Sequence, residues 1–254
     1  MKFVFDIDGT ICFDGENIAM PIYEILRKGS EYGHEVIFAS GRAYRDCLPV
    51  LKDPLSSGYI VGLNGGAVHY RNKVLQYRVF PHDLYLFVAD FCRKNNIPYF
   101  IDDVMDYHSF RKEEMPFAEY VDAHHRAKEL ALDEIENPIK MIIALKDHLD
   151  KRDDLIRQIK RWDVDALFFD RSDLLYIQPK GCSKGSTLKE LFGEYICFGN
   201  DKNDISMFEH AMYGVQVGDL SDLHPYSHEI IPLDQHVIDN LCASIQALYQ
   251  KFRT

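Results

Sequence analysis

The amino-acid sequence predicts an α/β protein with a doubly wound, mainly parallel sheet that is interrupted by an inserted α+β domain. Short apolar runs alternate with helical patterns toward both ends of the chain. These runs are apolar on both faces, as expected for a parallel sheet buried between two layers of helices. A middle block, bracketed by Pro81 and Pro179, mixes helical and strand patterns without this alternation.

The first part of the core, residues 1–80, contains three apolar runs that are rich in β-branched and aromatic residues, as buried strands are. These predicted strands are residues 2–7, 35–39 and 59–63. A helical pattern follows each of the first two runs, and Pro21 and Gly33 suit the start and the end of the first helix. The second helix is expected at residues 43–51. Two further short runs about Arg71-Asn72 predict a hairpin.

Residues 81–178 are expected to form the inserted domain, because helices and strands there follow one another without strict alternation. The helices are expected at residues 82–95, within 116–132 and at 149–162. The strands are expected at residues 99–101, 107–110, 139–145, 166–169 and 174–177.

The alternation returns in residues 179–254, which are expected to complete the core. Helices are predicted at residues 183–192, 205–211 and 236–252, and strands at residues 195–198 and 214–217. The last helix is amphipathic, so it is expected to cover one face of the sheet.

Composition restricts the class of protein. The formal net charge of −11 argues against a broad nucleic-acid surface. No apolar run approaches the roughly 20 residues that span a bilayer, and Asp6 and Asp8 fall where a signal peptide would stay apolar. The six cysteines form no CxxC pair, which favours a reducing compartment. We therefore expect a cytoplasmic protein, monomeric or a small homo-oligomer, without membrane or nucleic-acid partners.

Two carboxylates stand directly after the first predicted strand. In an extended chain residues i and i+2 point the same way, so Asp6 and Asp8 are expected to project together from the sheet. Ligands of open parallel sheets bind at this carboxyl edge. Two close carboxylates repel each other unless a cation or a shared proton intervenes, and Mg²⁺ takes such oxygen ligands. Gly9 allows the chain to turn sharply there. A turn with capping aspartates is the alternative.

Other polar groups follow the remaining core strands or open a core helix. They are Ser40-Gly41-Arg42, Asn64-Gly65, Lys184 and the acidic stretch from Asn200 to Asp204. Each group alone also fits an ordinary turn or helix start. Together they form a set suited to phosphoryl transfer through an aspartyl-phosphate.

This ordered set resembles the haloacid dehalogenase-like (HAD) hydrolase superfamily, and within it subclass IIB, the Cof-like phosphatases. The DxDGT motif spans residues 6–10, the SGR motif residues 40–42, and an SKG motif contains Lys184. An Asn-Gly step and an ND-containing loop complete the pattern. The resemblance implies a Rossmann-like core, a cap domain inserted between the second and third motifs, and a Mg²⁺-dependent phosphatase.

The resemblance also implies residue roles. Asp6 would attack phosphorus, and Asp8 would protonate the leaving group and then activate water. Mg²⁺ would be held by Asp6, the main-chain oxygen of Asp8 and the acidic stretch. The phosphate contacts are expected from Ile7, Gly9, Thr10, Ser40, Gly41, Arg42, Lys184 and Asn203. Weaker substrate or cap contacts are expected from Asn64 and Gly65.

Two positions depart from the family pattern. The fourth motif usually reads GDxxND, and this spacing places Asn200 where a metal-binding aspartate is expected. The motif-four metal ligand is therefore open among Asn200, Asp201 and Asp204. Later, Gly218-Asp219-Leu220 stands where the family usually has GNA.

The substrate is expected to be a small phosphorylated metabolite, by default a sugar phosphate, with pyridoxal phosphate or nucleotides as alternatives. A polar-aromatic group in the inserted domain is either a substrate-facing set or a solvated turn. Its members are Asp102, Asp103, Asp106, Tyr107 and His108. The alternative functions are a phosphomutase on the same scaffold, a receiver-type signalling protein phosphorylated on aspartate, and a catalytically inactive binding protein.

Overall fold

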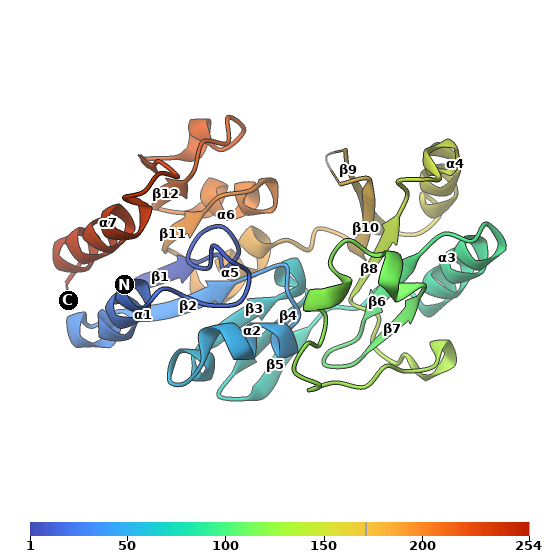
Figure 1. Ribbon diagram of the computed structural model, residues 1–254, viewed down its shortest axis with the longest axis horizontal. Coiled ribbons are helices and arrows are strands. Elements are labelled where there is room, and N and C mark those ends of the chain that lie inside the picture. The colour runs from blue at the N-terminus through green and yellow to red at the C-terminus, as the bar shows by residue number, and fades with distance from the viewer. Residues whose placement is uncertain (171, 254) are drawn as a thin grey trace. The chain divides into compact units, whose positions relative to one another are not determined.

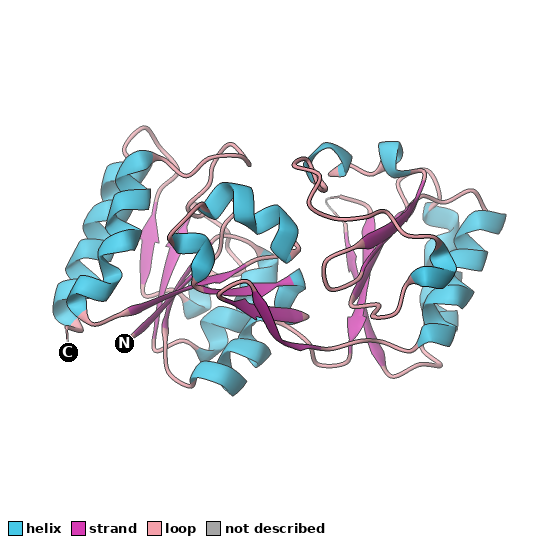
Figure 2. Ribbon diagram, turned by 90° about the horizontal axis from the view of Figure 1, so that it is seen from below, coloured by secondary structure: helices cyan, strands magenta, loops and turns pink. Residues whose placement is uncertain are grey.

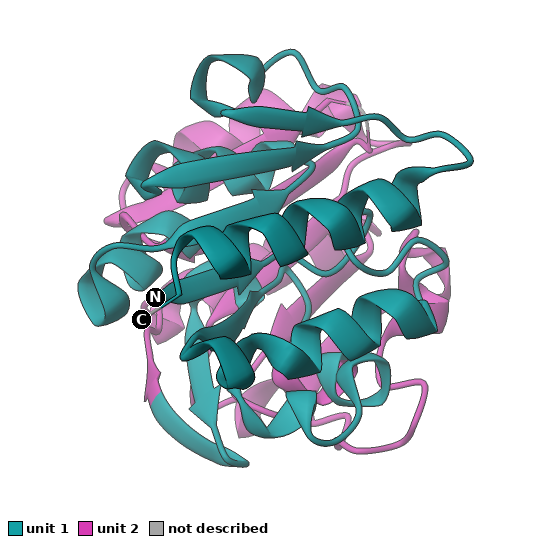
Figure 3. Ribbon diagram, turned by 90° about the vertical axis from the view of Figure 1, so that its left-hand side faces the viewer, with its two compact units in different colours: residues 1–42, 47–75, 183–254 teal, residues 43–46, 76–182 magenta. Residues whose placement is uncertain are grey.

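The computed structural model describes residues 1–170 and 172–253. The chain divides into two compact units (Figure 3). Unit 1 consists of residues 1–42, 47–75 and 183–254, and unit 2 consists of residues 43–46 and 76–182. The chain thus leaves unit 1 after residue 75, where the sequence suggested residue 80, and returns at residue 183, where it suggested residue 179. The short segment 43–46 belongs to unit 2, which no sequence pattern indicated.

Unit 1 is built on an eight-stranded sheet with the order β13-β12-β11-β1-β2-β3-β4-β5 (Figure 1). Neighbours from β13 to β3 are parallel, and β4 is antiparallel to β3. The predicted doubly wound, mainly parallel sheet is therefore confirmed. The strands are β1 (Lys2–Phe5), β2 (Glu35–Ala39), β3 (Tyr59–Gly62), β4 (Ala67–Tyr70), β5 (Lys73–Tyr77), β11 (Ile196–Gly199), β12 (Tyr213–Val217) and β13 (Glu229–Ile231).

Helices cover both faces of this sheet (Figure 2). They are α1 (Met20–Arg27), α2 (Tyr44–Leu51), α5 (Lys184–Phe192), α6 (Ile205–His210) and α7 (Val237–Lys251). Alternate strand residues serve the two faces, as the two-residue period of a strand requires. Val4 packs in one cluster with Leu188 of α5 and Met207 of α6, whereas the ring of Phe3 meets that of Tyr249 of α7 at 4.7 Å between centroids. Because both faces of these strands pack against helices, their sequences are continuous apolar runs.

Unit 2 contains a five-stranded antiparallel sheet with the order β7-β6-β8-β10-β9. Its strands are β6 (Tyr99–Asp102), β7 (Tyr107–Phe110), β8 (Lys140–Ala144), β9 (Val164–Phe169) and β10 (Leu174–Pro179). Its helices, α3 (His82–Lys94) and α4 (Leu149–Ile159), lie on one face of the sheet (Figure 2). One apolar cluster joins residues of both helices to the sheet, among them Val88, Leu155 and Met141.

The opposite face of the unit 2 sheet is covered by irregular chain. Met115, Phe117 and Val121 pack there against Phe100 and Ile142. The predicted helix within residues 116–132 is wrong, because these apolar residues meet the sheet from short turns. Asp122 has a positive φ of 50°, which no α-helix allows, and its side chain accepts the amides of Arg126 and Ala127.

The remaining short elements are 3₁₀ turns, which connect the strands and helices. They are η1 (Lys28–Tyr32), η2 (Leu55–Ser57), η3 (Leu63–Gly65), η4 (Lys112–Glu114), η5 (Ala118–Tyr120), η6 (Leu132–Glu134), η7 (Lys202–Asp204) and η8 (His224–Tyr226). In the described part of the chain, no helix has the length and apolar character needed to cross a membrane.

A buried charge network ties segment 43–46 to the unit 2 sheet. The guanidinium of Arg45 donates to Asp102 at 2.7 Å and to the main-chain oxygen of Met105 at 3.0 Å. The ammonium of Lys140 lies 3.3 Å from the second carboxylate oxygen of Asp102. The side chains of Arg45 and Asp102 are almost fully buried, so neither charge is compensated by water.

Replacing Asp102 by alanine is expected to destabilise unit 2 by about 3–5 kcal/mol, because Arg45 and Lys140 keep their buried charges without a shared partner. Asp154→Ala is the matched control. It removes an exposed pair with Arg157 of the same unit and should change stability by less than about 0.5 kcal/mol. The fluorescence of Trp162, the single tryptophan, reports urea unfolding of unit 2. Equal midpoints for the two variants would contradict the network's role.

Candidate active site

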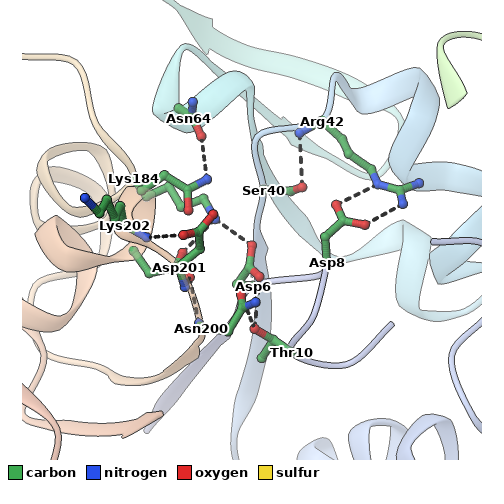
Figure 4. A network of polar contacts seen from close by, with 12 residues as sticks. Asp6, Asp8, Thr10, Ser40, Arg42, Asn64, Lys184, Asn200, Asp201 and Lys202 are labelled. Atoms are coloured by element: carbon green, nitrogen blue, oxygen red, sulfur yellow. Dashed lines mark hydrogen bonds and ion pairs between the residues drawn. The ribbon is translucent and has the colours of Figure 1, made fainter. Parts of the chain in front are cut away.

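The first aspartate of the DxDGT stretch lies at the carboxyl edge of β1, in the middle of the unit 1 sheet. The amide of Asp6 donates to the main-chain oxygen of Phe198 at 2.9 Å, which ties it to the end of the neighbouring strand β11. The hydroxyl of Thr10 donates to Asp6 Oδ2 at 2.9 Å. Only 4% of Asp6 is exposed. Its carboxylate is therefore shielded from bulk water and held in one place by the contacts drawn in Figure 4.

Lys184, at the start of α5, joins two buried carboxylates. Its Nζ atom donates to Asp6 Oδ1 at 2.6 Å and to Asp204 Oδ1 at 2.7 Å. Ser183 caps the helix by accepting the amide of Ser186 at 3.1 Å. This cap fixes Lys184 as the first residue of α5. A lysine in the first turn of a helix is disfavoured by the helix dipole. Here the two carboxylates outweigh that effect.

The charges of this cluster determine its protonation. Burial by itself lowers the pKa of Lys184, but Asp204 and Asp6 raise it above its ordinary value, so the ammonium stays charged. Burial, together with repulsion from Asp204, raises the pKa of Asp6 to about 7, although Lys184 acts in the opposite direction. One ammonium thus faces two buried carboxylates. The uncompensated negative charge favours a further cation beside Asp6.

Asp204 is fully buried and uses both carboxylate oxygens inside unit 1. Oδ1 accepts from Lys184, and Oδ2 accepts the amides of Asn200 at 2.9 Å and Asp201 at 3.1 Å. A side chain on Gly199 would lie 2.8 Å from the Asp204 carboxyl carbon, so only glycine allows this close approach. Asp204 therefore shapes the loop after β11 and holds Lys184.

Asp201 is exposed, and its carboxylate accepts the amide of Lys202 at 2.7 Å at the start of η7. Its role in the structure is that of a cap on this turn. The three candidates of the acidic stretch thus divide their tasks. Asp201 caps the turn, Asp204 holds Lys184, and Asn200 places its side-chain amide 3.1 Å from Asp6 Oδ2.

One corner of the Asn200 side-chain amide lies 2.9 Å from the main-chain oxygen of Asp8 and 3.1 Å from Asp6 Oδ2. With Nδ2 at this corner, the amide donates to both oxygens. With Oδ1 there, it lies 3.1 Å from the Thr10 hydroxyl oxygen, whose single proton is donated to Asp6, and it faces the oxygens of Asp6 and Asp8. Around Mg²⁺, ligands at about 2.1 Å place neighbouring oxygens about 3.0 Å apart. The second arrangement therefore fits a magnesium ion.

This donor set contains a single carboxylate side chain. Within the described ranges, no group of three or more His, Cys, Asp or Glu side chains is arranged to hold a metal. A site made of one carboxylate, one amide oxygen and one main-chain oxygen contains only one side chain of these four types, so it does not form such a group. Gly9 makes the approach of Asn200 possible, because it has a φ of +75° and a side chain there would lie 2.2 Å from the amide.

The side chain of Asp8 lies apart from this cluster and is about half exposed. The guanidinium of Arg42 holds it with two hydrogen bonds, Nε to Oδ2 at 2.8 Å and Nη2 to Oδ1 at 2.5 Å. Burial by itself lowers the pKa of Arg42, but the hydrogen bonds and the negative charge of Asp8 raise this pKa above its ordinary value. The sequence suggested a phosphate contact for Arg42, whereas the structure places this side chain on Asp8 (Figure 4).

The loops after β2 and β3 meet beside the cluster. The buried hydroxyl of Ser40 accepts the amide of Arg42 at 3.1 Å, which leaves its own proton available for a ligand. Asn203 donates to the Asn64 side chain at 3.2 Å. Gly41 faces this pair, and a side chain on it would lie 3.2 Å from the Asn64 amide oxygen. The structure thus brings Ser40, Asn64 and Asn203 to one edge.

Gly65 has a packing role that the sequence did not indicate. A side chain there would lie 2.3 Å from the main-chain oxygen of Ser183, and the Gly65 oxygen accepts the Thr187 hydroxyl at 3.0 Å. Gly65 therefore allows the start of α5, and with it Lys184, to approach η3. Sequence reasoning also missed Gly15, whose main-chain oxygen accepts from Arg42 at 2.6 Å. A main-chain contact leaves no side-chain signal in a sequence.

The polar-aromatic candidates of unit 2 have local partners. Asp103 accepts the amides of Glu136 and Asn137, and Asp106 accepts the amide of Lys128. The ring of His108 contacts the Tyr99 hydroxyl and the main-chain oxygen of Leu130. Tyr107 accepts from Lys112, and Asp102 binds Arg45. In the structure these side chains organise the loops of unit 2.

The departure at Gly218-Asp219 also has a local explanation. The carboxylate of Asp219 lies 2.7 Å from His224 Nε2, and both side chains are exposed. Gly218 has a positive φ of 84° and leads into this surface turn.

Comparison with known proteins gives a match over most of the chain. A family model described as haloacid dehalogenase-like hydrolase matches residues 3–224. An HMP-PP phosphatase of Serratia proteamaculans is 25% identical over an alignment of 237 residues, and the match covers 84% of this chain and 82% of the relative. A phosphoglycolate phosphatase of Methanoculleus marisnigri is 26% identical over 221 residues, with the same coverage.

Solved structures share the fold. A haloacid dehalogenase-like hydrolase from Bacteroides thetaiotaomicron superposes with a TM-score of 0.82 at 19% identity, covering 97% of this chain and 98% of that one. A sugar phosphatase of HAD subclass IIB superposes with a TM-score of 0.77 at 20% identity, with the same coverage. At these identities the likeness concerns the fold, including both units of the chain.

Asp204→Ala is expected to destabilise unit 1 by about 3–5 kcal/mol, because the buried ammonium of Lys184 loses one partner and two loop amides lose their acceptor. Asp201→Ala removes only an exposed cap and should cost about 1 kcal/mol or less. Calorimetric unfolding of the two variants measures the difference. If Asp201→Ala proved as damaging as Asp204→Ala, this division of tasks within the loop would be incorrect.

Proposed function

Because the chain belongs to the haloacid dehalogenase-like hydrolase family, we propose that it is a Mg²⁺-dependent phosphatase of small phosphorylated metabolites. The predicted family is confirmed by the match over residues 3–224. The observation that carries the proposed mechanism is the buried Asp6 carboxylate, fixed between the ammonium of Lys184 and the hydroxyl of Thr10. Two relatives with phosphatase names support the reaction class.

In the first step, a carboxylate oxygen of Asp6 attacks the phosphorus of the substrate. A bond forms between this oxygen and phosphorus, while the bond from phosphorus to the leaving oxygen breaks. The carboxyl of Asp8 gives its proton to the leaving alkoxide. The products of this step are the alcohol and an aspartyl-phosphate on Asp6.

In the second step, Asp8 accepts a proton from water as the water oxygen attacks phosphorus. The bond between phosphorus and Asp6 breaks, which releases inorganic phosphate and restores the Asp6 carboxylate. Asp8 regains the proton that it gave in the first step, so the protein returns to its starting state.

The phosphoryl oxygens are held by groups gathered around Asp6. Ser40 has a hydroxyl proton to donate, and the main-chain amides of Ile7 and Gly41 follow the strands β1 and β2. Lys184 supplies a positive charge next to the attacking carboxylate. Because Lys184 is buried and paired, it keeps this charge while the substrate binds.

The Mg²⁺ ligands of this chain would be the Asp6 carboxylate, the main-chain oxygen of Asp8 and the side-chain oxygen of Asn200. The distances of 2.9 Å from the Asn200 amide to the Asp8 main-chain oxygen and 3.1 Å to Asp6 Oδ2 support this assignment. Asp204 is a poor candidate because both its oxygens already accept hydrogen bonds, and Asp201 caps η7. When bound, the ion would neutralise negative charge between Asp6 and the phosphoryl group and orient that group.

The substrate class proposed is a small phosphate monoester, with sugar phosphates first. This choice draws on the solved sugar phosphatase that shares the fold, while the two sequence relatives carry names with other substrates. A cytoplasmic location belongs to the same proposal, since the scattered cysteines suit a reducing compartment.

The proposed reaction predicts release of inorganic phosphate from an aryl phosphate in the presence of Mg²⁺, and its loss when the metal is removed by a chelator. Asp6→Asn should lower kcat by roughly a thousandfold or more, because the amide is no nucleophile. Asp239→Asn, an equally conservative change on the exposed side of α7, serves as control. Full activity of Asp6→Asn, or transfer to a second sugar hydroxyl without free phosphate, contradicts the phosphatase mechanism.

The proposed metal site predicts that Asn200→Asp binds Mg²⁺ roughly tenfold more tightly than the natural chain, because a carboxylate replaces a neutral oxygen beside a hard cation. Calorimetric titration with Mg²⁺ alone measures this effect independently of turnover. Asp201→Asn should leave the affinity within about twofold, since the change lies on the exposed cap. The opposite pattern would place the metal on Asp201.

A further inference from the structure

We propose that Arg42 is a positioning residue that fixes the carboxylate of Asp8 for proton transfer, and that it does not bind the phosphoryl group. The inference rests on the proposed function, because it assigns Arg42 to the steps in which Asp8 takes part. It differs from the expectation drawn from the sequence, in which Arg42 contacts phosphate.

The first support is the geometry of the pair. Nε and Nη2 of Arg42 donate to the two different oxygens of Asp8, at 2.8 and 2.5 Å. Such two-point binding determines both the position and the plane of a carboxylate. A single lysine ammonium acts as a point charge and cannot fix that plane.

The second support is that Arg42 is fixed at its base while Asp8 is not enclosed. The Arg42 amide donates to Ser40 Oγ at 3.1 Å, and its main-chain oxygen accepts the Leu63 amide at 2.9 Å. The Arg42 side chain is 15% exposed and that of Asp8 is 48% exposed. Because about half of the Asp8 side chain faces solvent, the two hydrogen bonds from the guanidinium are the restraint on its position.

A third hydrogen bond also holds the guanidinium. Nη2 of Arg42 also donates to the Gly15 main-chain oxygen at 2.6 Å. The turn that contains Gly15 is closed by Asp14, whose Oδ1 accepts the amides of Glu16 at 2.8 Å and Asn17 at 2.7 Å. The turn therefore presents a fixed acceptor, and Nη2 of Arg42 binds both this acceptor and Asp8.

These contacts argue against a phosphate role. A phosphoryl oxygen that bound Nε or Nη2 would have to displace Asp8 or Gly15 from short hydrogen bonds. Arg42 thus aids the site through Asp8.

The test compares Arg42→Ala and Arg42→Lys with the natural chain, using one aryl and one alkyl phosphate. Positioning predicts that kcat for the alkyl phosphate falls roughly 10- to 100-fold, whereas KM and the inhibition constant of inorganic phosphate stay within about twofold. The aryl phosphate, whose leaving group needs less proton donation, should lose less. Guanidinium chloride added to Arg42→Ala should restore part of kcat. Arg27→Ala, which removes an exposed pair with Glu24, is the control.

Two further results decide whether Arg42 acts through Asp8. In the Asp8→Asn background, Arg42→Ala should cause no additional loss of kcat, since the restrained carboxylate is already absent. Independent losses in the two variants would overturn the inference. So would a raised KM with weaker phosphate inhibition at unchanged kcat, because that pattern marks a phosphate ligand.

A structural measurement separates this inference from the proposed function. In a crystal structure of Arg42→Ala, or of Arg42→Lys if the alanine variant does not fold, the Asp8 carboxylate should leave its present position or occupy several. An Asp8 that stays in place overturns the inference whether or not the protein releases phosphate. Absence of phosphate release by the natural chain, with Asp8 displaced in the variant, would instead count against the proposed function.

Discussion

The ammonium of Lys184, buried between the carboxylates of Asp6 and Asp204, is the interaction on which the arrangement of the site depends. It joins three parts of unit 1 that are far apart in sequence: the end of β1, the start of α5 and the loop after β11. Burying these charges is costly unless each one is paired and hydrogen-bonded. The contacts of Lys184, Thr10 and the loop amides meet that requirement, and they leave Asp6 in a fixed position.

The same cluster explains why the acidic loop contains residues that are not equivalent. Asp204 must face inward to reach Lys184, and the loop amides then turn toward its second oxygen. This folding of the loop places Asn200 against Asp6 and leaves Asp201 at the surface. A neutral amide at Asn200 adds no third negative charge to the buried pair. The loop therefore does not need a bound cation for its stability, and the side-chain oxygen of Asn200 can still bind one.

Much of this could be predicted from the sequence because it follows from short-range patterns. The DxDGT stretch and Lys184 were recognisable by residue type and by their place after strands or at a helix start. Other features depend on contacts between distant residues. The pairing of Arg42 with Asp8 joins a long side chain to a partner 34 positions away. No local pattern could favour Asp8 over a phosphate. Likewise, nothing in the sequence alone distinguishes the buried Asp204 from the exposed Asp201.

The elements that were missed have similar causes. Residues 116–132 contain apolar side chains that pack on a sheet face, and Asp122 closes a turn where a helix was expected. Strand β13 is only three residues long, and its extended conformation depends on pairing with β12. Segment 43–46 joins unit 2 through the buried pair of Arg45 and Asp102. In each case tertiary contacts decide the local structure, and these are not visible in propensity or periodicity.

The most direct test of this account is a crystal structure of the protein with Mg²⁺ and beryllofluoride, which mimics a phosphoryl group on an aspartate. The account predicts the adduct on Asp6, with the ion bound by Asp6, the Asp8 main-chain oxygen and Asn200 Oδ1 at about 2.1 Å, and with Lys184 still joined to Asp204. An ion held by Asp201 or Asp204, or an adduct on another carboxylate, would contradict it.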